Sequence, residues 1–517
     1  MYRPRSFACV TALAAGLASA ALASSAPSVA TSSAALSAPA ASAVSVPPSA
    51  AKVSARPPIV VTPDVIRLPG EPTRSPLSTL QCEETEGIAC YEPDQIRAAY
   101  QLPALYARGV TGAGETIVIV DSFGSPTISS DLATFDKRFD YPAPPKFSII
   151  TPAGQIPGFD PNNSNMVSWA EETTLDVEYA HALAPGASIL LAETPTSENE
   201  GTSGFPQIVT AEEYVIDHGL GAVISQSFSA TEETFASYAQ IRPLRVAYLD
   251  AYSHHVTVLA ASGDAGATDY TANGSDFYTR RVTSWPDSDP LVTGVGGTQL
   301  LESAGAYTSV AWNDTDNTAS DEYWGGSTDP DPLASGGGTS EYFARPSYQD
   351  GVEAVTGASR GVPDIAMSGA CNGAVNVYSS FANGPAGWSL TCGTSESTPE
   401  FAAIVALAEQ VAGHPLGLLN PTLYALLATH APGLVDVTSG NNTVSFRQGS
   451  ATEPYTVTGY QAVKGYNLVT GVGTVDASKF VYELAGIPVP QPPVDSPPPG
   501  EPSGSLRPVS PQARSAR

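Results

Sequence analysis

The chain has 517 residues, of which 51 are acidic and 23 are basic, and its formal net charge is −28. A balance this negative excludes proteins that bind nucleic acid through a basic surface, because the phosphates would be repelled. Hydrophobic residues make up 42% of the chain and aromatic residues 8%, which is typical of a folded protein and excludes a chain that is disordered throughout.

The first residues have the pattern of a secretory signal peptide. Arg3 and Arg5 precede the apolar run Phe7–Ala23, and the small residues at the end of that run fit the cleavage pattern. We expect residues 1–23 to be a signal peptide, cleaved near Ala23 or Ala26, and the protein to be secreted and extracellular. No later stretch reaches the roughly 18–20 apolar residues that a membrane span requires, so we expect no membrane association.

Two segments have the composition of extended linkers. Residues 24–57 consist almost entirely of Ala, Ser, Pro, Val and Thr, and residues 487–517 contain runs of proline. We predict a low-complexity linker or short pro-region over residues 24–85, a single folded domain over residues 86–486, and a Pro-rich disordered tail over residues 487–517.

Four cysteines follow the predicted signal peptide, which is the even number expected for disulfides in an oxidising compartment. They allow three pairings, and proximity in the sequence favours Cys82–Cys90 and Cys371–Cys392. They form no C-x-x-C motif or Cys/His cluster that would indicate zinc.

Short apolar segments rich in Val and Ile alternate with helical patterns in the first half of the predicted domain. Strands buried on both faces have this composition, and their alternation with helices predicts a parallel sheet covered by helices, an α/β fold. The predicted strands are Glu115–Asp121, Ala187–Glu193, Ala222–Ser225 and Val256–Ala261, and the predicted helices are Ser130–Arg138, Trp169–Leu183, Thr210–His218 and Leu244–Tyr252.

A serine stands at a turn that opens a helix. Gly393-Thr394-Ser395 precedes Pro399 and the apolar helical run Phe401–Val411. A serine in this position can expose its hydroxyl as a nucleophile, with the helix N-terminus stabilising negative charge nearby. Taken alone, the same pattern is more typical of a helix-capping serine.

A nucleophilic serine needs a base, and none of the six histidines has the flanking residues of a subtilisin histidine. His181 alone therefore indicates a core or surface residue. Glu172 and Asp176 offer an alternative, because residues i and i+4 share one helix face. Two neighbouring carboxylates raise the pKa of one of them and create a group able to exchange a proton with serine at acidic pH. An isolated pair of this kind is also typical of a solvated helix face.

An aspartate flanked by glycine and alanine follows the predicted strand Val256–Ala261. Asp264 in Ser262-Gly263-Asp264-Ala265-Gly266 has the setting of an ordinary turn residue. When protonated, it could instead donate a hydrogen bond to a developing oxyanion.

The order of an acidic pair, an aspartate and a serine resembles the sedolisin family of serine-carboxyl peptidases, relatives of subtilisin in which a carboxylate pair replaces the histidine. The resemblance implies a subtilisin-like three-layer fold with a mostly parallel central sheet flanked by helices. It covers about residues 86–486 and extends to Cys90-Tyr91-x-Pro93, Leu175-Asp176-x-Glu178, Ala184-Pro185-Gly186-Ala187, Val295-Gly296-Gly297-Thr298, Ser335-Gly336-Gly337-Gly338 and Arg360-Gly361-Val362-Pro363-Asp364.

The resemblance implies a role for each of these residues. Ser395 would be the nucleophile, Glu172 the general base and acid, Asp176 its orienting partner, and Asp264 the oxyanion donor. Asp121, which ends the first predicted strand, would support the acidic pair or be purely structural. The implied substrates are proteins or peptides, the implied pH optimum is acidic, roughly pH 3 to 5, and we expect a monomer.

The family also has a calcium site near the C-terminus, built from two acidic side chains and several backbone carbonyls. Asp436-Val437 and the segment containing Val463, Gly465 and Asn467 match its position. Asn467 replaces the second expected aspartate. The resemblance therefore implies a Ca²⁺ site weakened by the loss of one negative charge.

Two other functions compete with this interpretation. One is a histidine-dependent subtilisin-type peptidase that uses Asp121, His181 and Ser395. The other is a non-catalytic secreted binding protein on a peptidase scaffold.

Overall fold

The computed structural model describes residues 66–67, 72–315, 330–381 and 386–490. The chain divides into a unit Met1–Ala55, which lies outside these ranges, and a unit Arg56–Arg517, which contains the described structure. The predicted signal peptide, residues 1–23, also lies outside the described residues, as do most of the predicted linker and of the predicted tail.

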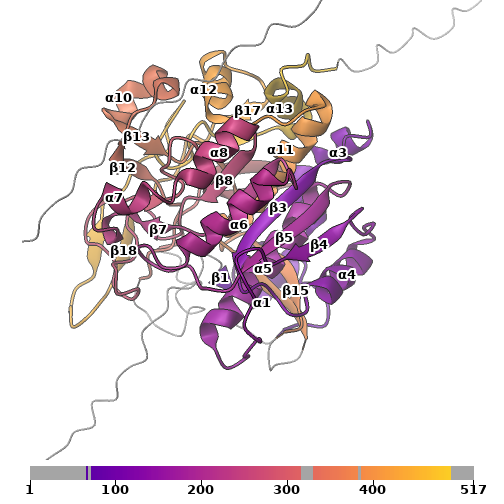
Figure 1. Cartoon of the computed structure of the whole chain (residues 1–517), viewed down its shortest axis with the longest axis horizontal. Coiled ribbons are helices and arrows are strands. Elements are labelled where there is room, and N and C mark those ends of the chain that lie inside the picture. Colours follow the sequence, from indigo (N-terminus) through magenta and orange to yellow (C-terminus); the bar gives the residue numbers. More distant parts are fainter. Residues whose placement is uncertain (1–65, 68–71, 316–329, 382–385, 491–517) are drawn as a thin grey trace, which may run out of the picture. The chain divides into compact units, whose positions relative to one another are not determined.

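A central eight-stranded sheet organises the second unit (Figure 1). Its strand order is β11-β10-β8-β6-β3-β5-β4, with β14 also paired to β10, and only the β10–β11 pair is antiparallel. The predicted parallel α/β fold is therefore confirmed. The strands are β3 Thr116–Ser122, β4 Phe147–Ile150, β5 Ser188–Thr194, β6 Val223–Gln226, β8 Thr257–Ala261, β10 Thr293–Ser303, β11 Ala306–Ala311 and β14 Ile365–Ser368.

Helices cover both faces of the sheet, and the alternating side chains of β3 separate the two layers. Ile117 and Ile119 pack into a core with α5 (Ser164–Leu183) and α11 (Thr394–Ala412). Val118 and Val120 point the other way, into a core with α6 (Phe205–Asp217) and α8 (Val246–His254). Successive side chains of a strand point to opposite faces of the sheet, and those of β3 are apolar on both faces. Both faces must therefore be covered, which gives a three-layer arrangement.

A smaller sheet packs against α5. Its strands, in order, are β1 (Ile66–Arg67), β16 (Gly387–Cys392), β15 (Ala374–Ser379) and β2 (Cys90–Tyr91). Strand β15 packs on α4 (Ile128–Phe139) and α5. The Tyr179 hydroxyl of α5 donates to the Asn376 carbonyl of β15 at 3.1 Å. This cover explains why α5 has almost no exposed face, so its side chains are held rigidly.

Two disulfides connect the cysteines as their proximity in the sequence favoured. Cys82–Cys90 and Cys371–Cys392 have S–S distances of 2.01 and 2.09 Å. The first bridge ties α1 (Thr79–Thr85) to β2 (Cys90–Tyr91), so packed structure begins before residue 86, inside the segment predicted to be of low complexity.

The remaining elements are short and surround these layers. Among the described residues, no helix is both long enough and apolar enough to span a bilayer. The other elements are β1 Ile66–Arg67, α2 Pro93–Ala99, α3 Leu102–Tyr106, β7 Ala230–Thr231, η1 Glu232–Thr234, α7 Tyr238–Ile241, β9 Ser284–Trp285, β12 Gly338–Ala344, η2 Ser347–Val352, α10 Glu353–Thr356, β13 Ser359–Val362, β15 Ala374–Ser379, β16 Gly387–Cys392, α12 Asn420–Ala428, β17 Leu434–Val435, β18 Val444–Phe446, β19 Tyr455–Val457, β20 Thr474–Val475 and α13 Ala477–Leu484.

Candidate active site

Three neighbouring strands of the central sheet end in polar residues at one edge. Strand β6 pairs in parallel with β3 on one side and with β8 on the other. Asp121 lies at the end of β3, Ser227 directly follows β6, and Asp264 lies in the turn after β8. Because the carboxyl ends of parallel strands meet at a common edge, the sheet gathers these three side chains.

Helix α5 brings two carboxyl groups to this edge. Glu172 and Asp176 are four residues apart and share one face of the helix. Both side chains are fully buried. Ser227 Oγ donates a hydrogen bond to Asp176 Oδ1 at 2.8 Å, which joins the acidic pair to the end of β6.

Ser395 lies in the first turn of α11, directly after the positive-φ residue Gly393 and Thr394. Its Oγ donates to the Ser227 carbonyl at 3.5 Å. Pro399, four residues later, has no N–H to donate to the Ser395 carbonyl. Ser227 Oγ lies 3.4 Å from that carbonyl oxygen, so Ser227 contacts both Asp176 and Ser395.

Asp264 accepts hydrogen bonds from Thr394, the residue before Ser395. Thr394 donates to Asp264 Oδ1 through its backbone N–H at 2.7 Å and through its hydroxyl at 2.8 Å. Asp264 Oδ2 has no hydrogen-bond partner among the described residues. When Asp264 is protonated, its proton therefore resides on Oδ2, because Oδ1 already accepts two hydrogen bonds.

Burial controls the protonation of the acids at this edge. Desolvation raises the pKa of Asp264 to about 8, although the two hydrogen bonds from Thr394 oppose the shift. Desolvation also raises the pKa of Asp121 to about 7. The pKa of Asp176 is raised well above its usual range, first by burial and then by the negative charge of Asp121, while the hydrogen bond from Ser227 lowers it. Protons are therefore retained here at pH values where exposed carboxylates are ionised.

The structure thus gathers Asp176, Ser395 and Asp264 at one edge, with Glu172 one helical turn before Asp176. Two contacts were not anticipated from the sequence: the hydroxyl of Ser227 on Asp176, and the N–H and hydroxyl of Thr394 on Asp264. The only signal for Ser227 is its position after a buried strand, next in the sheet to the strands that lead to Asp121 and Asp264.

The histidine-dependent alternative is not supported by the position of His181. Its Nε2 lies 2.9 Å from the Pro142 carbonyl and 3.2 Å from Asp136 Oδ1, in contacts with α4 and the segment after it. Ser395 Oγ instead donates to the Ser227 carbonyl.

The residues implied for calcium lie in and beside a tight loop after β19. Asp436 accepts the Gly465 N–H through both carboxylate oxygens, at 3.0 and 3.2 Å. Asn467 directs its Nδ2 towards the carbonyls of Val463 and Gly465, at 3.2 and 3.5 Å. Carbonyls that accept from an amide face a donor rather than a cation. The donor set therefore does not fit the implied calcium site, and among the described residues no three His, Cys, Asp or Glu side chains form a group suited to a metal.

Comparison with known proteins gives several relatives. No protein-family model matches the chain. Kumamolisin from Bacillus sp. (strain MN-32) is 34% identical over 403 residues, which cover 76% of this chain and 63% of kumamolisin. Tripeptidyl-peptidase 1 from Homo sapiens is 30% identical over 318 residues, which cover 59% of this chain and 50% of that protein. The chain thus spans between half and two thirds of the length of these relatives.

A solved structure supports the same grouping at the level of the fold. Pseudomonas sedolisin, a serine-carboxyl proteinase complexed with two molecules of pseudo-iodotyrostatin, superimposes with a TM-score of 0.62 at 24% identity, and the match covers 77% of this chain and 99% of that one. The parallel sheet, the position of the serine at the start of α11 and the similarity to kumamolisin agree: the chain belongs to the sedolisin family.

Proposed function

We propose that this protein is a serine-type peptidase that hydrolyses peptide bonds in proteins or peptides, with Ser395 as the nucleophile. The observation that carries the proposal is the position of Ser227, which donates to Asp176 and contacts the hydroxyl and the carbonyl of Ser395. The second support is that Thr394, next to Ser395, binds Asp264. A serine, an acidic pair and a buried acid are thus held together by four elements of the fold.

In the proposed reaction, Ser395 Oγ attacks the carbonyl carbon of the scissile peptide bond while Glu172 accepts the Oγ proton. Asp176 supports Glu172 from one helical turn away, and Ser227 fixes the orientation of Asp176. Collapse of the tetrahedral intermediate breaks the C–N bond, and Glu172 returns the proton to the leaving amine. A water molecule then attacks the acyl-enzyme, with Glu172 again acting first as base and then as acid, and Ser395 is regenerated.

Asp264 is proposed to stabilise the oxyanion through a proton on Oδ2. The hydrogen bonds that Oδ1 receives from Thr394 orient the carboxyl group relative to Ser395. A neutral acid is required for this role, because a carboxylate would repel the oxyanion. The raised pKa of Asp264, about 8, keeps the acid protonated at and below neutral pH.

Asp121 is proposed to regulate the charge of the acidic pair rather than to contact substrate. It is fully buried, and its negative charge is a cause of the raised pKa of Asp176. With Asp121 protonated on the acid side of its pKa of about 7, Asp176 and Glu172 more easily hold the single negative charge that a base requires. This is consistent with an optimum on the acid side of neutrality.

Ser395, Glu172 and Asp176 are completely buried in this conformation, and Asp264 is 9% exposed.

Secretion and a monomeric state complete the proposal as predictions from the sequence. Calcium is not part of the proposal, because the donor set at Asn467 does not fit the ion.

Hydrolysis of a denatured protein and of a peptide mixture over a range of pH tests the proposal. We expect cleavage with a maximum on the acid side and none by a Ser395→Ala variant with the same thermal stability. A maximum at or above neutrality would contradict the carboxyl mechanism. Complete inactivity of the folded wild-type protein at every pH would favour a binding protein on a peptidase scaffold.

A further inference from the structure

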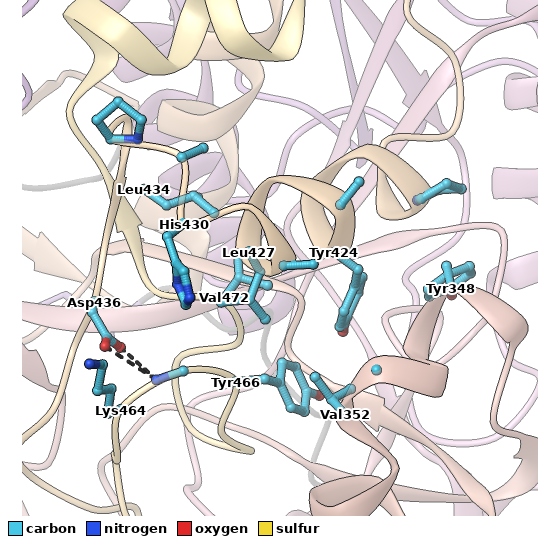
Figure 2. A pocket seen from close by; sticks show the side chains of 17 residues that line it. Tyr348, Val352, Tyr424, Leu427, His430, Leu434, Asp436, Lys464, Tyr466 and Val472 are labelled. Carbon is cyan, nitrogen blue, oxygen red and sulfur yellow. Dashed lines mark hydrogen bonds between the residues drawn. The ribbon is translucent and has the colours of Figure 1, made fainter.

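The loop implied to bind calcium, residues 463–471, is closed by its own hydrogen bonds. The Asn467 N–H donates to the Gly471 carbonyl at 3.1 Å, and the Gly471 N–H donates to the Asn467 carbonyl at 3.0 Å. Gly465 has a φ of +80°, and its N–H donates to Asp436 (Figure 2).

The side chain of Asn467 is at the centre of this loop and is only 2% exposed. Its Oδ1 accepts from the Val469 N–H at 3.1 Å, from the Thr470 N–H at 2.9 Å and from the Thr470 hydroxyl at 3.2 Å. Its Nδ2 donates to the carbonyls of Val463 and Gly465.

These partners fix which end of the amide is nitrogen. Backbone N–H groups can only donate and backbone carbonyls can only accept. A flipped amide would place Nδ2 against the two N–H groups of Val469 and Thr470, and Oδ1 against the two carbonyls of Val463 and Gly465. The orientation therefore follows from four backbone groups.

We infer that the Asn467 amide takes the place of a bound cation in this loop, so that this protein stabilises the loop without calcium. The carbonyls of Val463 and Gly465 converge on a hydrogen-bond donor. The Asn467 oxygen cannot serve as a ligand without giving up its three donors, and Asp436 is the only one of the implied side-chain ligands that carries a charge.

The loop matters because it is connected to the candidate active site. Ser335 Oγ donates to the Val469 carbonyl at 3.0 Å. The next residue, Gly336, donates its N–H to the Gly263 carbonyl at 2.7 Å, and a Cβ at Gly336 would lie 1.8 Å from the Ser262 carbonyl oxygen. The loop is thus connected, through Ser335 and Gly336, to the turn that presents Asp264.

Asn467→Asp tests the inference because it is isosteric and reverses the donor. Its ionised oxygen would face the carbonyls of Val463 and Gly465, and three oxygens without a cation repel one another. At about pH 6, where aspartate is normally ionised, we expect the variant to unfold at a temperature lower than wild type by about 2–4 °C in EDTA. Millimolar calcium should raise this midpoint, whereas the wild-type midpoint should be the same in EDTA and in calcium.

Asn467→Ala is the matched control, because it also loses the amide but gains no carboxylate, and its lowered midpoint should not respond to calcium. Calorimetric titration of calcium into EDTA-treated wild type should give no saturable heat, and this measurement stands even if Asn467→Asp fails to fold. Saturable calcium binding by wild type that Asp436→Asn abolishes would overturn the inference. So would an Asn467→Asp variant with wild-type stability in EDTA.

Discussion

Replacing Ser227 by alanine should shift the acid limb of the pH–activity profile without removing any group that reacts. The Ser227 hydroxyl has one proton and can donate one strong hydrogen bond. Its contact to Asp176 Oδ1 is 2.8 Å and its contact to the Ser395 carbonyl is 3.4 Å, so the hydroxyl donates to Asp176. That bond favours the ionised form and lowers the pKa of Asp176. Its removal must therefore raise the pKa of Asp176 further, so that a higher pH is needed before the Glu172 and Asp176 pair carries the single negative charge that the base requires.

The size of the shift follows from the strength of such a bond. A hydrogen bond to a charged group contributes about 1.5–3 kcal/mol, and one pKa unit corresponds to about 1.4 kcal/mol. The acid limb of kcat/KM should therefore move up by about 1–2 pH units in Ser227→Ala. Hydrolysis of one peptide, measured from strongly acidic to mildly alkaline pH, gives both the position of the limb and the height of the plateau.

Ser225→Ala is the matched control. Ser225 is also a buried serine of β6, two residues earlier, but its hydroxyl has no hydrogen-bond partner among the described residues. We expect its acid limb to coincide with that of wild type. If Ser227→Ala lowers the plateau and leaves the limb in place, Ser227 acts only through packing, and the assignment of the base to the acidic pair loses its main support.

Three further predictions concern the acids. Asp264→Asn should move the alkaline limb of the profile upwards even if total activity falls, because an amide donates without needing a proton that is lost near pH 8; an unshifted limb would remove Asp264 from the oxyanion role. Glu172→Gln should reduce kcat by at least about 100-fold, whereas His181→Gln, measured with the same peptide, should leave kcat nearly unchanged; the reverse result would favour a histidine base. Finally, the folded state retains protons on Asp121, Asp176 and Asp264 that the unfolded chain releases near pH 4. The free energy of unfolding should therefore fall as pH rises from about 4 to 8, by about 1.4 kcal/mol per pH unit for each extra proton that the folded state binds. Denaturant midpoints that rise over this range would contradict these pKa shifts.

Much of the scaffold could be predicted because its signals are local. The run from Glu115 to Asp121 is apolar on both faces, and the observed strand is displaced from it by one residue. Helix ends were less accurate: α5 begins at Ser164 rather than Trp169, because Asn163 accepts hydrogen bonds from two N–H groups of the first turn. That capping signal lies outside the apolar pattern that predicted the helix.

The connections within the site could not be predicted, because they join segments far apart in the chain. Ser227 and Asp176 are 51 residues apart, and Asp264 and Thr394 are 130 residues apart. The reversed amide of Asn467 was missed for a related reason, since the residue type permits both a ligand and a donor. Only the surrounding N–H and carbonyl groups decide between them.

Direct detection of the acyl-enzyme tests the central claim that Ser395 is the nucleophile. The protein would be mixed with a peptide ester at acidic pH, quenched rapidly with strong acid, digested and analysed by mass spectrometry. We predict a mass increase equal to the acyl group on the peptide that contains Ser395, and its absence in Ser395→Ala. An acyl group on another residue, or rapid hydrolysis by Ser395→Ala, would contradict the account.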